Sequence, residues 1–245
     1  MLQFVPKPIK RMAARYLGKC GFIPVSAGFP SLDTVMGRRR DLQAATVIDV
    51  GASDGRWSEQ MMKYLPKAKY LLVEAQQAAH GEKLKHFVAL HPNAAYALCA
   101  AGDREGEIEF DASDPFGGIA STTPFLRNNV RVPMESIDHL VKERNLGGPF
   151  LLKLDTHGFE VPILEGARKT LHESAMLIIE AYNFTLCPGA LRFYELCQFL
   201  EPRGFRCVDM FDLMIRPGDN AFWQMDMVFL RSTHPVFQSN RYRSD

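Results

Sequence analysis

The sequence predicts an α/β fold with an open, mostly parallel β-sheet. Short apolar runs occur at 46–50, 69–73 and 150–154, and stretches with apolar residues at helical spacing follow them. Such runs fit strands that are buried on both faces of a parallel sheet. Six or seven strands alternating with helices imply a sheet covered on both sides. Residues 205–231 contain two more strand-like segments joined by a turn, which predicts an antiparallel hairpin at the end of the sheet.

The composition is that of an ordinary globular protein. The 245 residues are enough for one full hydrophobic core. Lys+Arg 29 against Asp+Glu 28 gives a net charge of +1, so nothing favours a nucleic acid or an anionic membrane as partner. The five cysteines include no C-x-x-C pair, which predicts neither a disulfide framework nor a zinc site and favours the cytoplasm. No apolar run approaches the roughly 18 residues of a membrane span.

We expect one α/β domain over residues 46–232, an N-terminal helical extension over 1–45 and a C-terminal tail over 233–245. The extension is basic and partly amphipathic, and the run Arg38-Arg39-Arg40 lies near its end. A helix packed on the edge of the domain is the simpler interpretation. A substrate lid or a helix on a membrane surface is the alternative, so peripheral membrane contact stays open.

Residues 46–58, TVIDVGASDGRWS, predict a strand, a tight turn and a helix, which is a place where nucleosides bind. The dinucleotide fingerprint G-x-G-x-x-G needs glycines at 51, 53 and 56, but Ser53 and Arg56 accompany Gly51. The Gly-Lys-Ser/Thr run of a phosphate-binding loop is also missing. The remaining pattern, acid-x-Gly-x-x-x-Gly, suits a nucleoside without a pyrophosphate, and S-adenosylmethionine is the commonest such cofactor.

Carboxylates follow the ends of several predicted strands. Glu74 ends the second strand 23 positions after Gly51, where α/β nucleoside sites bind the two ribose hydroxyls. Asp103 follows the third strand and would either accept a hydrogen bond from an adenine amino group or serve as a turn residue. Asp155 and Glu180 follow two later strands. Because parallel strands bring their carboxyl ends to one edge, we expect these residues to converge on one site.

Residues 111–124 form the longest loop-like stretch of the chain. Long loops at a ligand edge often carry function, so we expect Ser121 or Thr122 to line the pocket. Trp57 recurs with other apolar residues at helical spacing and is expected in the core rather than at the cofactor.

Five segments carry a resemblance to a known family: VIDVGASDGRWS, LLVEA, AGDREGEIEF, VPMESIDHLV and LLKLDTHGFEVPILEGA. In this order and spacing they resemble the FkbM-type S-adenosylmethionine-dependent methyltransferases, over residues 46–231. The resemblance implies a Rossmann-like class I methyltransferase fold, with a mostly parallel seven-stranded sheet and an antiparallel C-terminal strand. It also implies methylation of a hydroxyl group on a sugar or other small metabolite, with S-adenosylmethionine as cofactor.

The resemblance further implies roles for individual residues. Asp49 and Gly51 would shape the methionine pocket, and Glu74 would bind the ribose. Asp103 would lie near the adenine, and Asp155 beside the transferred methyl group. The full set of expected cofactor contacts is Asp49, Gly51, Ala52, Ser53, Glu74, Ala75, Gly102, Asp103 and Asp155. One position of this chain departs from the family pattern. After the residues that match Asp155 and Thr156, family members often carry Glu or Gln, whereas this chain carries His157.

Methyl transfer from a sulfonium is an in-line displacement, and an alcohol acceptor must also lose its proton. We expect His157 to act as general base, with Asp155 or Glu180 orienting it or holding the substrate. The alternative is that His157 is a turn residue without a chemical role. No metal site is assigned, although in a metal-assisted version Asp155, Glu180 and another oxygen ligand would hold Mg²⁺ against the acceptor oxygen.

Two other functions remain open on the sequence. A nicotinamide oxidoreductase is weakened, but not removed, by Ser53 and Arg56. A non-catalytic nucleoside-binding protein would account for the departure at His157. The sequence identifies neither the acceptor nor the oligomeric state.

Overall fold

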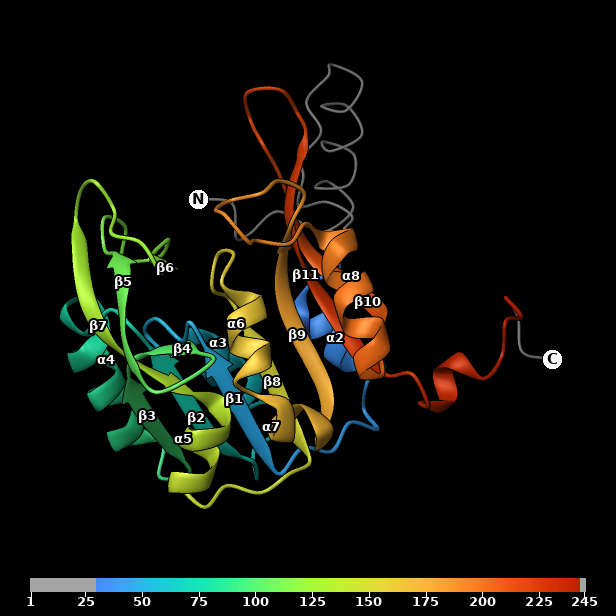
Figure 1. The fold of residues 1–245 in the computed structure, drawn as a ribbon. Helices are drawn as coiled ribbons and strands as arrows, with labels where there is room; N and C mark the ends of the chain where they lie inside the picture. Colours follow the sequence, from blue (N-terminus) through green and yellow to red (C-terminus); the bar gives the residue numbers. More distant parts are fainter. Residues whose placement is uncertain (1–29, 243–245) are drawn as a thin grey trace, which may run out of the picture.

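A seven-stranded sheet forms the centre of the computed structural model, which describes residues 30–242. Its strands are β1 (Thr46–Val50), β2 (Lys69–Glu74), β3 (Ala94–Leu98), β8 (Phe150–Leu154), β9 (Ser174–Tyr182), β10 (Phe205–Ile215) and β11 (Phe222–Arg231). Their spatial order is β10-β11-β9-β8-β1-β2-β3 (Figure 1). All pairs from β9 to β3 are parallel, whereas β11 is antiparallel to both of its neighbours. The predicted sheet and its C-terminal hairpin are therefore confirmed.

Helices cover both faces of this sheet (Figure 1). On one face lie α2 (Leu32–Arg38), α3 (Arg56–Met61) and α4 (Gln77–Leu90), and on the other α5 (Ile137–Glu143), α6 (Glu160–Glu165), α7 (Arg168–His172) and α8 (Phe193–Leu200). Val47 packs with the first group of helices and Ile48 with the second. All side chains of β1 and β8 are buried, which explains why these strands show no polar alternation. Two 3-10 helices occupy Glu201–Arg203 and Pro235–Phe237.

A second, four-stranded sheet corrects part of the prediction. Its strands are β4 (Ala100–Gly102), β5 (Gly106–Asp111), β6 (Ile119–Ser121) and β7 (Asn129–Ser136), in the order β4-β7-β5-β6. The sequence suggested one strand that continues to Asp103. In the structure the main-sheet strand ends at Leu98, and after Cys99 the chain joins the second sheet by pairing β4 with β7. Asp103 therefore does not follow a strand of the main sheet.

The helix expected after the strand at 150–154 is divided into α6 and α7. The break lies at Gly166 and Ala167, where the chain approaches the second sheet. A Cβ atom on Gly166 would lie 1.9 Å from the carbonyl oxygen of Gly102, so only glycine allows this close approach. Pro162 lies in the first turn of α6, where a proline is tolerated.

Residues 1–29, which include most of the expected N-terminal extension, lie outside the described residues. Within 30–242, helix α2 packs Leu32, Val35 and Met36 into the core beside the sheet. Arg38 at its end forms an ion pair with Asp209 of β10, at 2.9 Å. None of the described helices combines the length and apolar character needed to cross a bilayer.

Candidate active site

A cavity of about 600 Å³ opens at the carboxyl ends of β1, β2, β8 and β9. Open α/β sheets bind ligands where the strand order reverses, and here it reverses between β1 and β8. The cavity brings together residues from the ends of four strands, which the sequence analysis expected at one edge of the sheet. The predicted residues that line it are Gly51, Ala52, Ser53, Glu74, Ala75, Asp155, His157 and Glu180.

The turn after β1 forms the floor of the cavity. Gly51 has a φ of +74°, and its N–H donates to the carbonyl of Val73, at 3.0 Å. A Cβ atom on Gly51 would lie 2.0 Å from the carbonyl oxygen of Asp155. Glycine is therefore required here both by its backbone conformation and by the close approach of β8. Ser53, with a φ of +52°, has a buried hydroxyl without a hydrogen-bond partner among residues 30–242, and it lines the cavity.

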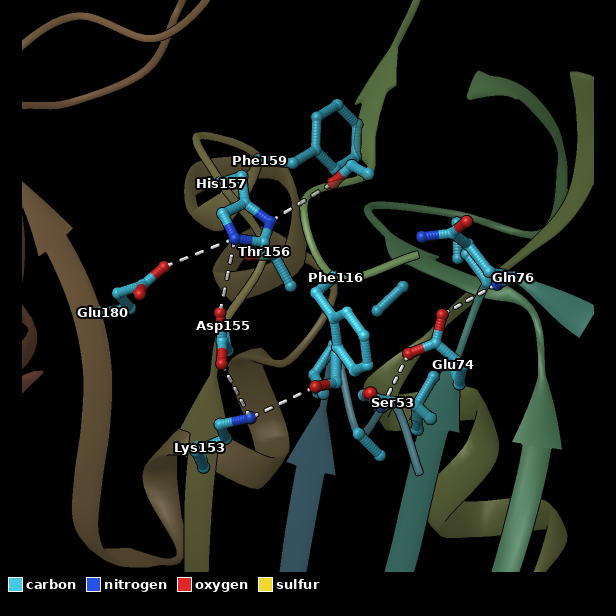
Figure 2. Close-up of a pocket in the computed structure, with 18 of the residues that line it drawn as sticks. Ser53, Glu74, Gln76, Phe116, Lys153, Asp155, Thr156, His157, Phe159 and Glu180 are labelled. Atoms are coloured by element: carbon cyan, nitrogen blue, oxygen red, sulfur yellow. Dashed lines mark hydrogen bonds and ion pairs between the residues drawn. The ribbon is translucent and has the colours of Figure 1, made fainter. Parts of the chain in front are cut away.

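Glu74 lies at one end of the cavity and is held by two backbone N–H groups (Figure 2). Its Oε2 accepts from the N–H of Ser53 at 2.7 Å, and its Oε1 accepts from the N–H of Gln76 at 2.8 Å. The residue is only 6% exposed. Each carboxylate oxygen has a second lone pair, so both remain able to accept a hydrogen bond from a ligand hydroxyl in the cavity.

A buried lysine that the sequence analysis did not assign lies under the turn. Nζ of Lys153 is 2.9 Å from Oδ1 of Asp49, and it donates to the carbonyl of Gly51 at 3.2 Å. It also lies 3.4 Å from Oδ2 of Asp155 (Figure 2). Burial alone would lower the pKa of Lys153, but the two carboxylates raise it above its ordinary value. Asp49 also accepts from Ser58 Oγ at 2.7 Å. Asp49 thus supports the cavity from behind and does not line it.

At the other end of the cavity, His157 lies between two carboxylates (Figure 2). Its Nε2 is 3.6 Å from Oδ1 of Asp155 and 3.6 Å from Oε2 of Glu180. Glu180 accepts hydrogen bonds from the Tyr182 hydroxyl and the Gln224 amide. Burial, followed by the negative charge of Asp155, raises the pKa of Glu180 to about 9. Burial would also raise the pKa of Asp155, but the positive charge of Lys153 holds it below its ordinary value.

The turn after β8 directs His157 into the cavity. His157 has a φ of +54° and Gly158 a φ of +106°, so two successive residues have left-handed backbone conformations. Glu160 stabilises the turn by accepting from the N–H of Gly158 at 2.8 Å and from Oγ1 of Thr156 at 3.2 Å. The other ring nitrogen of His157, Nδ1, lies 3.3 Å from the carbonyl oxygen of Gly118.

The loop that follows β5 contacts both ends of the cavity, but not through the residues we expected. Pro115, Phe116, Gly118 and Ala120 line the cavity, whereas Ser121 and Thr122 do not. The loop is fastened to α4 through two side chains. Gln76 Nε2 donates to the carbonyls of residues 114 and 115, at 2.9 and 3.2 Å, and Nε2 of His80 lies 2.6 Å from the carbonyl of residue 115.

Comparison with known proteins identifies the family. Residues 49–207 match the family model of the FkbM methyltransferase domain. The chain belongs to the FkbM methyltransferase family. Membership in the family confirms methyl transfer as the class of reaction and S-adenosylmethionine as the cofactor, and it removes the nicotinamide oxidoreductase as an alternative. None of the curated proteins matches the sequence.

Solved structures with low sequence identity are similar to the FkbM chain. A putative tRNA (m1A22) methyltransferase from Streptococcus pneumoniae is 13% identical, with a TM-score of 0.47, over 82% of this chain and 68% of its own. A putative O-methyltransferase from Klebsiella pneumoniae is 12% identical, with a TM-score of 0.46, over 94% of this chain and 92% of its own. TrmK of M. capricolum, solved with S-adenosylhomocysteine, is 9% identical, with a TM-score of 0.46, over 83% and 70% of the two chains.

Besides Asp49, two more residues expected at the cofactor of this FkbM protein do not line the cavity. Asp103 is exposed, and its carboxylate pairs with Arg104 at 3.0 Å. Gly102 is buried against Met134, whose Sδ would lie 2.4 Å from an added Cβ atom. The change of sheet after Cys99 moves both residues away from the rim. Small apolar side chains line the cavity in their place, namely those of Cys99, Ala100 and Ala101, together with Phe110.

The sequence analysis also missed several residues that line the cavity. Trp57 was expected in the core; it packs against the core but also lines the cavity, with its ring centre 5.5 Å from Lys153 Nζ. Gln224 comes from β11, which lies far from Glu180 in the sequence. Of these missed residues, only Lys153 could have been found from the sequence, because a lysine within the apolar strand 150–154 requires a buried acid as partner.

Proposed function

We propose that the protein methylates a hydroxyl group of a small metabolite or sugar. One observation carries this proposal: two different polar groups line the same cavity. The carboxylate of Glu74 is placed to bind a ribose. The cluster of Asp155, His157 and Glu180 is able to bind an acceptor oxygen and its proton. Since β1 lies between β2 and β8, the two groups are separated by two strand spacings, about 10 Å. If the ribose of S-adenosylmethionine binds Glu74, the methionine part of the cofactor would extend past the Gly51 turn toward the cluster.

The residues of the cavity fit S-adenosylmethionine part by part. Glu74 offers two oxygens to the ribose hydroxyls, and the unpartnered Ser53 hydroxyl offers a further hydrogen bond. The apolar surface of Cys99, Ala100 and Ala101 fits the adenine ring, in place of the Asp103 contact that the sequence suggested. When bound, the cofactor would supply an electrophilic methyl group on a sulfonium.

The acceptor end fits a hydroxyl better than an apolar carbon. His157, Glu180 and Tyr182 present polar groups to the cavity, and Asp155 stays ionised because Lys153 lowers its pKa. These groups orient the acceptor oxygen and take part in removing its proton. In the simplest form of the mechanism, Nε2 of His157 is the general base.

The proposal is tested by methyl transfer from methyl-labelled S-adenosylmethionine to fractionated cell extract. We expect label in the small-molecule fraction, attached to oxygen, and its loss when the His157→Ala variant replaces the wild type. Label in RNA or protein would overturn the proposed acceptor class. Tight binding of the cofactor without transfer to any fraction would instead indicate a non-catalytic nucleoside-binding protein.

A further inference from the structure

The cluster of Asp155, His157 and Glu180 has an unusual spacing. Two distances of 3.6 Å join Nε2 of His157 to the nearest oxygens of the two acids. Hydrogen bonds between nitrogen and oxygen are normally about 2.7–3.2 Å long, so neither pair is hydrogen-bonded. The three potential ligand atoms nevertheless all lie within 4.8 Å of one another. The three atoms therefore surround a common point, and neither acid is hydrogen-bonded to the histidine.

The tautomer of His157 makes this spacing informative. Nδ1 lies 3.3 Å from the carbonyl oxygen of Gly118, and a carbonyl only accepts hydrogen bonds, so Nδ1 carries the hydrogen. In the neutral ring Nε2 then has a lone pair and no proton. This lone pair faces the oxygens of Asp155 and Glu180. One imidazole nitrogen and two carboxyl oxygens thus face a common point, and a cation there would stabilise the arrangement.

We propose that Asp155, His157 and Glu180 bind a divalent cation that holds the acceptor oxygen beside the methyl group, an inference that rests on the proposed function. A cation equidistant from the three atoms would lie at most about 2.4 Å from each, which is compatible with metal–nitrogen and metal–oxygen bonds in proteins. One imidazole with two carboxylates favours a first-row cation such as Mn²⁺, Fe²⁺ or Zn²⁺ over Mg²⁺, which prefers oxygen ligands alone.

Further contacts hold each ligand in place. Oδ2 of Asp155, the oxygen that does not face His157, lies 3.4 Å from Lys153 Nζ. Glu180 accepts from the side chains of Tyr182 and Gln224, and the ring of His157 is oriented by the Gly118 carbonyl. Such outer contacts fix the orientation of ligands at metal sites and are often as necessary as the ligands. The cavity lies on the open side of the cluster, so water or an acceptor oxygen completes the coordination.

The cation would replace a general base by polarising the acceptor. A hydroxyl bound to a divalent cation loses its proton more readily than a free hydroxyl. The acceptor oxygen forms a bond to the methyl carbon while the carbon–sulfur bond breaks and sulfur keeps the electron pair. The hydroxyl proton passes to solvent. In this form of the mechanism His157 is a cation ligand and not the base.

A second group of similar composition provides a control. Glu105, Glu135 and His139 also lie within ligand distance of one another, and in residues 30–242 no other such group accompanies these two. In this group each ring nitrogen of His139 faces a different acid, at 3.5 and 3.7 Å, and the histidine and Glu105 are largely exposed. The two acids thus face opposite sides of the ring on the protein surface, and no common ring nitrogen faces both of them.

The experiment is a titration of the metal-depleted full-length protein with Mn²⁺, followed by electron paramagnetic resonance. We expect one site in the wild type, at least about tenfold weaker binding in His157→Ala and Glu180→Gln, and unchanged binding in His139→Ala. Binding of S-adenosylhomocysteine, measured by calorimetry on each variant, confirms an intact fold and tests the cofactor site separately. Absence of Mn²⁺ binding in a wild type that binds S-adenosylhomocysteine would overturn the cation and leave the base to His157. Loss of Mn²⁺ binding in His139→Ala alone would also overturn it.

Discussion

The carbonyl oxygen of Gly118 lies 3.3 Å from Nδ1 of His157, so a loop of the second sheet orients the histidine at the acceptor end. The loop is in turn fastened to α4, directly after the carboxylate that would bind the ribose. The Glu74 end and the His157 end of the cavity are therefore connected through this loop, which is hydrogen-bonded on both sides. Two pairs of matched substitutions test this connection.

Gly118→Ala is expected to displace the loop and misplace His157. A Cβ atom at this position would lie 2.4 Å from the Phe110 ring and 2.8 Å from Gln76 Nε2. Because a shift of about 1 Å near the reacting groups costs about 100-fold in rate, we expect turnover to fall by about 10- to 100-fold. In Gly117→Ala the new atom meets only the flexible side chain of Asp114, at 3.1 Å, so its turnover should stay close to wild type. Equal rates for the two variants would contradict the role of the loop.

Gln76→Ala removes the side-chain bonds to the loop but keeps the backbone N–H that holds Glu74. We therefore expect turnover to fall by about tenfold while S-adenosylhomocysteine binds almost as tightly as in the wild type. Gln77→Ala, an exposed neighbour on α4, serves as control. Initial rates and calorimetry on the same preparations provide the two measurements. A parallel loss of cofactor binding would show that Gln76 acts on Glu74 rather than on the loop.

Lys153→Met should destabilise the fold. The substitution leaves Asp49, which is fully buried, without its cation at 2.9 Å. Removing one partner of a buried ion pair typically costs about 3–5 kcal/mol of unfolding free energy. The double variant Lys153→Met/Asp49→Asn should recover much of this loss, and Lys69→Met, on the exposed end of β2, should change little. Urea unfolding measures all three, and additive losses in the double variant would refute the pairing.

Gly51→Ala should damage both stability and cofactor binding. The added atom would lie 2.0 Å from the Asp155 carbonyl, at a residue with a φ of +74°. A left-handed conformation alone costs an alanine about 1–3 kcal/mol, and the displacement of β8 adds to this. Gly37 of α2 has no atom within 4 Å of an added Cβ, so Gly37→Ala should stabilise the helix by roughly 0.5–1 kcal/mol. Thermal unfolding distinguishes the two, and a stable Gly51→Ala protein would contradict the tight turn.

The sequence was sufficient to place the parts of the site that are local in the chain. The turn at Gly51 and the carboxylate of Glu74 each follow one apolar run, and in the structure both line the cavity. The parallel sheet then brings such strand ends together without further information. His157 was predicted in the same way, from the transition from strand to turn after the apolar run 150–154, and it lines the cavity.

The misplaced and missed residues depend on contacts between distant segments. Asp103 was misplaced because nothing in the local sequence shows that the chain changes sheets after Cys99. Lys153 was not linked to Asp49 because the two are neighbours only through the register of β1 and β8. The contact between Gly118 and His157 likewise joins a loop and a turn 39 positions apart. Strand register and loop position are set by tertiary packing, which a single sequence does not reveal.

The central claim is that Glu74 binds the ribose of the cofactor, and calorimetry with S-adenosylhomocysteine tests it most directly. We predict one binding site in the wild type and binding weaker by about 10- to 100-fold in Glu74→Gln, since a hydrogen bond to a charged group contributes about 1.5–3 kcal/mol. Glu82→Gln, on the exposed face of α4, should bind like the wild type. Equal affinity of Glu74→Gln and wild type, or no heat with the wild type, would contradict the account.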